Sequence, residues 1–159
     1  MFHKKAFTVV EMTVVLGMIA TLLAYSIINL STIQHKAYLS STIDTFVSDL
    51  KQQQLKAMVG DTEGRSTNDY YGIYFSTNSY AMFHGSTYVV DPSNPVIPLT
   101  TNVTFSNIAF PQSQVVFNKG SGEVVGFSNG SNTVTMKNSV TNEMKTITIN
   151  RYGVITQIN

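Results

Sequence analysis

The sequence contains no cysteine, and its first proline is Pro92. The lack of cysteine excludes a disulfide framework, so the packing of helix and sheet must stabilise whatever folds. Between Gly17 and Gly60 there is neither glycine nor proline, and the two strongest helix breakers are therefore missing from that whole stretch. These absences predict one long N-terminal helix, covering residues 7–59, that stops at Gly60.

Charge is also scarce. Only 12% of the 159 residues are charged, and the formal net charge is +1. Two of the positive charges belong to Lys4 and Lys5, so the rest of the chain has no basic excess. A general electrostatic attraction to nucleic acid is therefore not expected.

The N-terminal part of the predicted helix is apolar. No formally charged residue lies between Glu11 and Lys36, and a helix of this length can cross a hydrocarbon core about 30 Å thick. We expect residues 7–34 to be the membrane-spanning part. Lys4 and Lys5 would hold the N-terminus in the cytoplasm, which places the rest of the chain outside.

A cleavable secretory signal is the alternative for this segment. A basic start followed by an apolar core has the same pattern, and Ala20 or Ala24 would be the small residue near the cut. The apolar run is longer than the usual signal core of roughly 7 to 15 residues, and nothing after Ala24 indicates a helix end.

The second half of the predicted helix is amphipathic. Apolar residues recur on one face of a helix, at Ile43, Phe46, Val47, Leu50 and Met58. We expect this stripe to pack against a sheet.

After Gly60, short runs of β-branched and aromatic residues alternate with turn residues, which predicts strands. The predicted strands are residues 70–75, 79–84, 87–90, 115–118, 133–137, 145–150 and 154–158. Residues 90–115 contain all four prolines and are predicted to form a connecting loop with at most one strand. Alternation in the sixth strand turns Ile147 and Ile149 to one face. The predicted fold is α+β: a long membrane-spanning helix packed by its C-terminal half on an antiparallel β-sheet domain, residues 60–159.

No catalytic constellation is evident. His3, His35 and His84 are scattered and lack helical pairing or a nearby carboxylate cluster. The glycine-rich run at residues 120–126, GSGEVVG, does not have the spacing of a dinucleotide-binding loop and is predicted to be a hairpin turn. We therefore expect a non-enzymatic protein without metal or cofactor.

The sequence offers two weaker candidate ligand sites. In the loop of residues 60–69, the oxygens of Asp61, Glu63, Asn68 and Asp69 could surround calcium, although their spacing is not that of a recognised calcium loop. Clustered tyrosines could stack on single-stranded nucleic acid, but without basic neighbours cross-strand packing is the better interpretation. These tyrosines are Tyr70, Tyr71, Tyr74, Tyr80 and Tyr88.

The N-terminus carries a family resemblance. Residues 4–23, KKAFTVVEMTVVLGMIATLL, resemble the processing and methylation signature of type IV prepilins and type II secretion pseudopilins. The resemblance implies that a prepilin peptidase removes residues 1–6 as a leader by cutting between Ala6 and Phe7. Phe7 would become the N-methylated first residue, and Glu11 would pair with the terminal amine of a neighbouring subunit. Most members have glycine where this chain has Ala6.

The remainder is similar to the minor-pilin group called GspH/FimT-type, in residues 49–59, 115–126 and 145–159. This implies a structural subunit of a type IV pilus-like filament for secretion, adhesion or DNA uptake. Its partners would be the peptidase, other pilins, the inner-membrane assembly platform and lipid, and it would be a single-pass protein of the bacterial cytoplasmic membrane.

Some FimT-like members bind DNA through a basic C-terminal segment. Here that segment holds only Lys145 and Arg151, which leaves DNA a weak candidate. The alternative function is an anchored surface β-domain that binds a ligand without polymerising.

Overall fold

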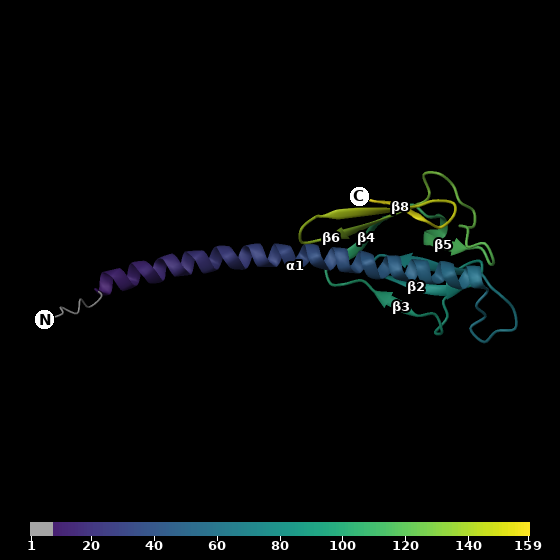
Figure 1. Ribbon diagram of the computed structural model, residues 1–159, viewed down its shortest axis with the longest axis horizontal. Helices are drawn as coiled ribbons and strands as arrows, with labels where there is room; N and C mark the ends of the chain where they lie inside the picture. Colours follow the sequence, from purple (N-terminus) through teal and green to yellow (C-terminus); the bar gives the residue numbers. More distant parts are fainter. Residues whose placement is uncertain (1–7) are drawn as a thin grey trace. The chain divides into compact units, whose positions relative to one another are not determined.

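The computed structural model describes residues 8–159, and for residues 27–33 it describes the backbone only. The chain divides into two compact units, Met1–His35 and Lys36–Asn159. Helix α1, Val9–Val59, begins in the first unit and ends in the second. Within residues 60–159, α1 is followed by eight strands and one short 3-10 helix. Figure 1 labels α1 and most of the strands.

The described part of the first unit is helical and apolar. Within residues 8–159, one helical segment, Val9–Ser26, is long and apolar enough to cross a membrane, and none of it is buried inside the protein. A signal sequence near the N-terminus has the same length and composition. By length and composition, the segment could anchor the chain in a membrane or be a signal sequence.

In the second unit, one face of α1 is buried along its whole length. Six of the buried residues are spaced alternately four and three residues apart, which keeps them on one side of the helix. They are Leu39, Ile43, Phe46, Leu50, Gln53 and Ala57, and Thr42, next to Ile43, is buried as well. The predicted stripe is thus confirmed at Ile43, Phe46 and Leu50, and Val47 is partly buried against the core. Met58 was wrongly included, since it is 48% exposed and Ala57 takes the buried position.

The helix ends at Gly60, as predicted. Gly60 has a positive φ of 68°, a conformation that glycine adopts without steric cost. The N–H of Asp61 donates to the carbonyl of Lys56 at 3.0 Å, which is the closing bond of a Schellman motif.

The strands form two antiparallel four-stranded sheets. The first sheet has the order β3-β2-β1-β5 and the second β4-β6-β7-β8. The first is built from β1 (Tyr71–Ser76), β2 (Ser79–His84), β3 (Val96–Pro98) and β5 (Gln114–Phe117). The second is built from β4 (Val103–Ile108), β6 (Thr133–Asn138), β7 (Met144–Ile149) and β8 (Ile155–Ile158). A short 3-10 helix, η1 (Pro111–Ser113), precedes β5.

Both sheets share one core with α1. The ring of Phe46 lies 5.8 Å from that of Phe75 in β1, 5.4 Å from that of Tyr80 in β2 and 5.9 Å from that of Phe105 in β4. In Figure 1 the part of α1 within this unit runs alongside strands of both sheets. Ile147 and Ile149 are fully buried, which confirms the predicted alternation. The α+β class is therefore confirmed, with the helix packed on two sheets.

The proline-rich stretch differs from the prediction. Residues 90–115 hold two strands, β3 and β4, instead of at most one. Pro98 lies at the end of β3, which is an edge strand and can accommodate proline there.

The predicted strand at residues 87–90 is wrong. The Tyr88 N–H donates to the side-chain oxygen of Gln114 at 2.9 Å instead of entering a ladder, and the Tyr88 ring stacks on Tyr74 at 4.2 Å. These side-chain interactions hold the segment outside the sheet.

Candidate functional sites

The predicted cleavage residues Ala6 and Phe7 lie outside the described residues, as does His3. Glu11 is described, and it belongs to the first turn of α1. Its Oε2 accepts hydrogen bonds from the Thr8 N–H at 2.9 Å and the Thr8 hydroxyl at 2.8 Å. In return, the Glu11 N–H donates to Thr8 Oγ1 at 3.2 Å. This reciprocal pair is a capping box that starts the helix.

The cap gives Glu11 a partner within its own chain, which the family resemblance alone does not suggest. The local signal was present, because threonine followed three residues later by glutamate ahead of an apolar run is the capping-box pattern. Both hydrogen bonds that the Glu11 carboxylate accepts from Thr8 use Oε2. A carboxylate can accept about four hydrogen bonds, so the cap leaves acceptor capacity for a second partner.

The loop that follows α1 is organised by ion pairs. Glu63 Oε1 lies 2.6 Å from Lys56 Nζ, and Glu63 Oε2 lies 3.0 Å from Arg65 Nη1. Arg65 Nη2 donates to the Tyr71 hydroxyl at 2.7 Å, and that hydroxyl donates to the Asp61 carbonyl at 2.7 Å. The loop is thereby tied to the end of α1 and the start of β1.

The same contacts bear on the calcium hypothesis. Glu63 is already neutralised by two cations, and Asp69 lies 3.1 Å from His84 Nδ1. Asp61 Oδ1 accepts a bond from the Glu63 N–H at 2.9 Å. In the part of the chain that the structure describes, no group of three or more metal-ligating side chains is assembled. The sequence placed these carboxylates near one another, and the fold gives them different partners: Lys56 and Arg65 for Glu63, and the His84 ring for Asp69.

The other candidates are dispersed. Tyr71 and Tyr80 are buried in the core, which confirms their predicted packing role. The run at residues 120–126 forms the predicted hairpin, with an isolated bridge between Phe117 and Val124. Arg151, one of the two C-terminal basic residues, lies 3.7 Å from Glu123.

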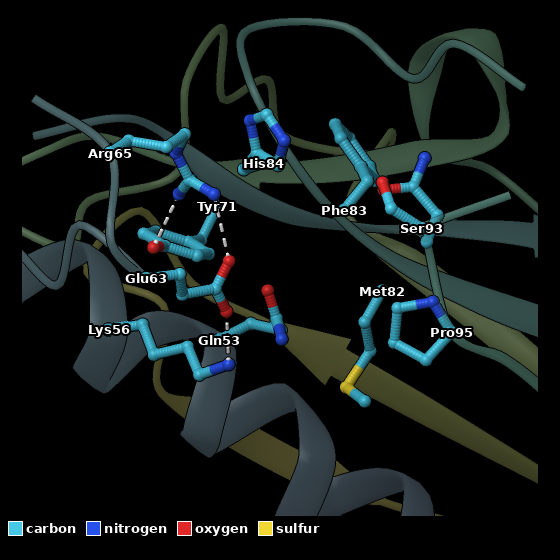
Figure 2. A pocket seen from close by; sticks show the side chains of 11 residues that line it. Gln53, Lys56, Glu63, Arg65, Tyr71, Met82, Phe83, His84, Ser93 and Pro95 are labelled. Atoms are coloured by element: carbon cyan, nitrogen blue, oxygen red, sulfur yellow. Dashed lines mark hydrogen bonds and ion pairs between the residues drawn. The ribbon is translucent and has the colours of Figure 1, made fainter. Parts of the chain in front are cut away.

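A cavity of about 430 Å³ opens beside the ion-pair cluster. Gln53 and Lys56 of α1, Arg65 of the loop, and Met82 and His84 of β2 contribute to its wall. Figure 2 shows the charged groups of Lys56, Glu63 and Arg65 on one side, with Met82 and Pro95 facing them across the cavity. This mixed lining was not predicted from the sequence, because its residues come from segments far apart in the chain.

The cluster makes stability depend on pH. Burial by itself would raise the pKa of Glu63, but hydrogen bonds and attraction from Lys56 and Arg65 outweigh it and hold this pKa below its ordinary value of 4.5. Glu63 therefore binds its proton less tightly in the folded than in the unfolded state. Its stabilising contribution is complete above pH 4.5 and is lost as the pH falls through the lowered folded-state pKa.

We expect Glu63→Gln to lower the melting temperature of the full chain in detergent at neutral pH. The difference in melting temperature between the variant and the wild type should be smaller at about pH 3. Melting curves of both chains across this range measure the effect. Asp44→Asn, at an exposed helix position, is the control and should follow the wild type. An unchanged pH dependence in Glu63→Gln would contradict the assignment.

No protein-family model matches the chain, and neither a curated protein nor a solved structure matches it.

Proposed function

We propose that this chain is a minor pilin or pseudopilin, a structural subunit that a prepilin peptidase processes and that joins a type IV pilus-like filament. Within that superfamily, the sequence after the N-terminus is similar to the GspH/FimT-type group. The filament would serve secretion, adhesion or DNA uptake, and the subunit would be held in the cytoplasmic membrane before assembly.

One combination carries the proposal. The KKAFTVVE sequence at residues 4–11 lies directly before an apolar helix, and this helix enters a unit where it packs on antiparallel sheets. A secretory signal needs no structural continuity with the folded body, whereas a subunit assembled through its helix does. The exposed apolar segment Val9–Ser26 would contact lipid first and other helices after assembly.

Glu11 would set the position of each incoming subunit. A carboxylate within an apolar helix is costly unless it is paired, and such residues usually have a partner. The terminal amine of Phe7 on a neighbouring subunit would be that partner. The capping box does not oppose this role, because Thr8 and Glu11 both remain after the cut and the bonds that the Glu11 carboxylate accepts from Thr8 use only Oε2.

The cap also favours the alternative, in which the chain is an anchored β-domain that binds a ligand and never polymerises. Thr8 supplies Glu11 with a role that requires no neighbouring subunit. Processing separates the two functions, since an anchor of this kind needs no cut ahead of Phe7.

We expect the mature protein to begin with N-methylated Phe7. Intact-mass and N-terminal peptide spectra of chain purified from a host with a prepilin peptidase measure this, and a host without the peptidase is the control. Ala6→Gly should be cut at least as completely, because both residues are small. A start after Ala20 or Ala24 would replace the pilin proposal with a secretory signal.

A further inference from the structure

The second sheet has an open edge at β8. Within the described chain, β8 pairs with β7 alone. The bonds between Thr146 and Asn159, at 2.8 and 3.1 Å, turn the backbone groups of Asn159 toward β7. Because these groups alternate in direction along an antiparallel strand, the N–H and C=O of Ile158 point away from β7. This edge can therefore accept another extended chain.

A groove of about 440 Å³ lies between β8 and α1. The residues of α1 that line it are spaced four and three apart, so they lie on one side of the helix. They are Val47, Lys51 and Gln54, and the residues that line the groove from the other side are Gly153, Val154, Ile155 and Ile158.

The groove is where the core side of the second sheet becomes exposed. Ile158 is paired with Ile147, and Ile155 with Ile149. Residues paired across an antiparallel ladder have side chains on the same face, so Ile158 and Ile155 point to the core side of the sheet. Ile147 and Ile149 are fully buried there, whereas Ile158, at the sheet edge, is 44% exposed. A strand added to β8 would place every second side chain over this uncovered part of the core.

The charge of the groove favours an acidic segment. Within residues 8–159, Lys51 is the only charged residue of the lining, and none of the ion pairs involves it. Asp44, on the same side of α1, lies about 10 Å away along the helix, and Asp49 is bonded to the Tyr80 hydroxyl. β8 contains no acidic residue, so a second copy that paired through its own β8 would bring no carboxylate to Lys51.

We propose that an extended segment of a partner protein pairs with the free edge of β8 and fills this groove. Its backbone bonds to the N–H and C=O of Ile158, and apolar side chains at alternate positions cover Ile158 and Val47. A carboxylate on the same face of the segment pairs with Lys51. The volume is adequate, since ligand pockets measure about 300–1,000 Å³. The groove lies wholly within Lys36–Asn159 and does not depend on processing or polymerisation of the chain.

The test is a titration of the full chain, labelled with ¹⁵N, in micelles of an uncharged detergent at about 0.1 M salt. The probe is acetyl-Val-Thr-Val-Thr-Glu-Thr-amide, whose valines and glutamate share one face of a strand. Two further peptides replace the glutamate with glutamine or lysine. We expect the glutamate peptide to shift the Ile158 amide resonance saturably and to slow its hydrogen exchange. The glutamine peptide should bind about threefold more weakly and the lysine peptide about tenfold, because an exposed ion pair contributes modestly.

N-methylated peptides test the backbone pairing. In an added strand, every second N–H faces β8 and the others face solvent. Two forms of the glutamate peptide carry N-methyl groups on alternate residues, one form on the odd and the other on the even positions. One form should bind at least about tenfold more weakly, while the other should stay within about threefold of the unmodified peptide.

A charge-reversed variant tests the role of Lys51. Lys51→Glu should bind the glutamate peptide about tenfold more weakly than the wild type does, and the lysine peptide more tightly. Its matched control is Lys36→Glu, which makes the same charge change at an exposed position of α1 about 22 Å away. The control should leave both affinities unchanged, because salt screens charges over that distance.

Four results would overturn the proposal. The first two are the absence of saturable shifts with the glutamate peptide, and equal or tighter binding of the glutamine or lysine peptide. The third is equal binding of both N-methylated forms, which would leave an apolar groove without strand addition. The fourth is an Ile158 resonance that shifts with protein concentration when no peptide is present, which would identify a second copy as the occupant. None of these results would alter the N-terminal mass spectrum that tests the proposed function.

Discussion

Replacement of Phe46 with alanine is expected to lower the free energy of unfolding of the Lys36–Asn159 unit by about 3–5 kcal/mol. Phe46 is fully buried, and its ring contacts Phe75 and Tyr80 of the first sheet and Phe105 of the second. Alanine would leave a cavity at the point where α1 and both sheets meet. The loss therefore includes the transfer free energy of the ring, the aromatic contacts and the cost of the void.

Near-UV circular dichroism of the full chain in detergent would follow this unit, and a change of this size corresponds to a fall of roughly 10–20 °C in melting temperature. Phe46→Leu should lose much less, because leucine refills part of the volume. Ser48→Ala, on the exposed face of the same helix, is the control. A fall of only a few degrees in Phe46→Ala would show that the two sheets do not depend on this contact.

Glu11→Gln is expected to leave the cut between Ala6 and Phe7 and membrane insertion intact, but to reduce incorporation into filaments by about tenfold or more. Glutamine at this position can still accept from Thr8, so the capping box is retained. Only the charge is removed. If the proposed filament pairs Glu11 with the amine of Phe7 on the next subunit, that amine would lose its counter-charge.

Thr8→Val is the matched control for the cap. It removes the hydroxyl that accepts from the Glu11 N–H at 3.2 Å and keeps the carboxylate. It should weaken the first helical turn and affect incorporation far less than Glu11→Gln. The measurement compares processed subunit in membranes with subunit in sheared or cross-linked filaments. Equal incorporation of Glu11→Gln and wild type would favour the anchored, non-polymerising alternative, and a larger defect in Thr8→Val would assign Glu11 to the cap.

The sequence by itself determined the elements whose signals are local. The lack of glycine and proline between Gly17 and Gly60 predicted a continuous helix, and Gly60 ended it through a positive φ that other residues adopt at a cost. Period-two alternation predicted β7 and its buried Ile147 and Ile149, and the hairpin turn at residues 120–126 was recognisable from its glycines. Each of these features depends only on residues that are close in the sequence.

Only the tertiary structure decided how the strands divide into two sheets. It also decided that residues 90–115 contribute one strand to each sheet. The prolines in this stretch indicated a loop, so β3 and β4 were not both predicted. Their pairing partners are β2 for β3 and the distant β6 for β4. Helical periodicity could not distinguish Met58 from Ala57 at the end of α1, because the neighbouring segments determine which face stays covered there.

The lining of the cavity also could not be predicted from local sequence signals. Gln53, Arg65 and Met82 lie far apart in the sequence, and nothing local to any of them indicates a shared wall. Glu63 and Asp69 appeared from the sequence to be parts of one carboxylate cluster, yet Glu63 pairs with Lys56 and Arg65, and Asp69 contacts the His84 ring instead. Unpaired buried atoms such as Gln53 Oε1 exist only once the chain has closed around them, so they are a property of the packed fold.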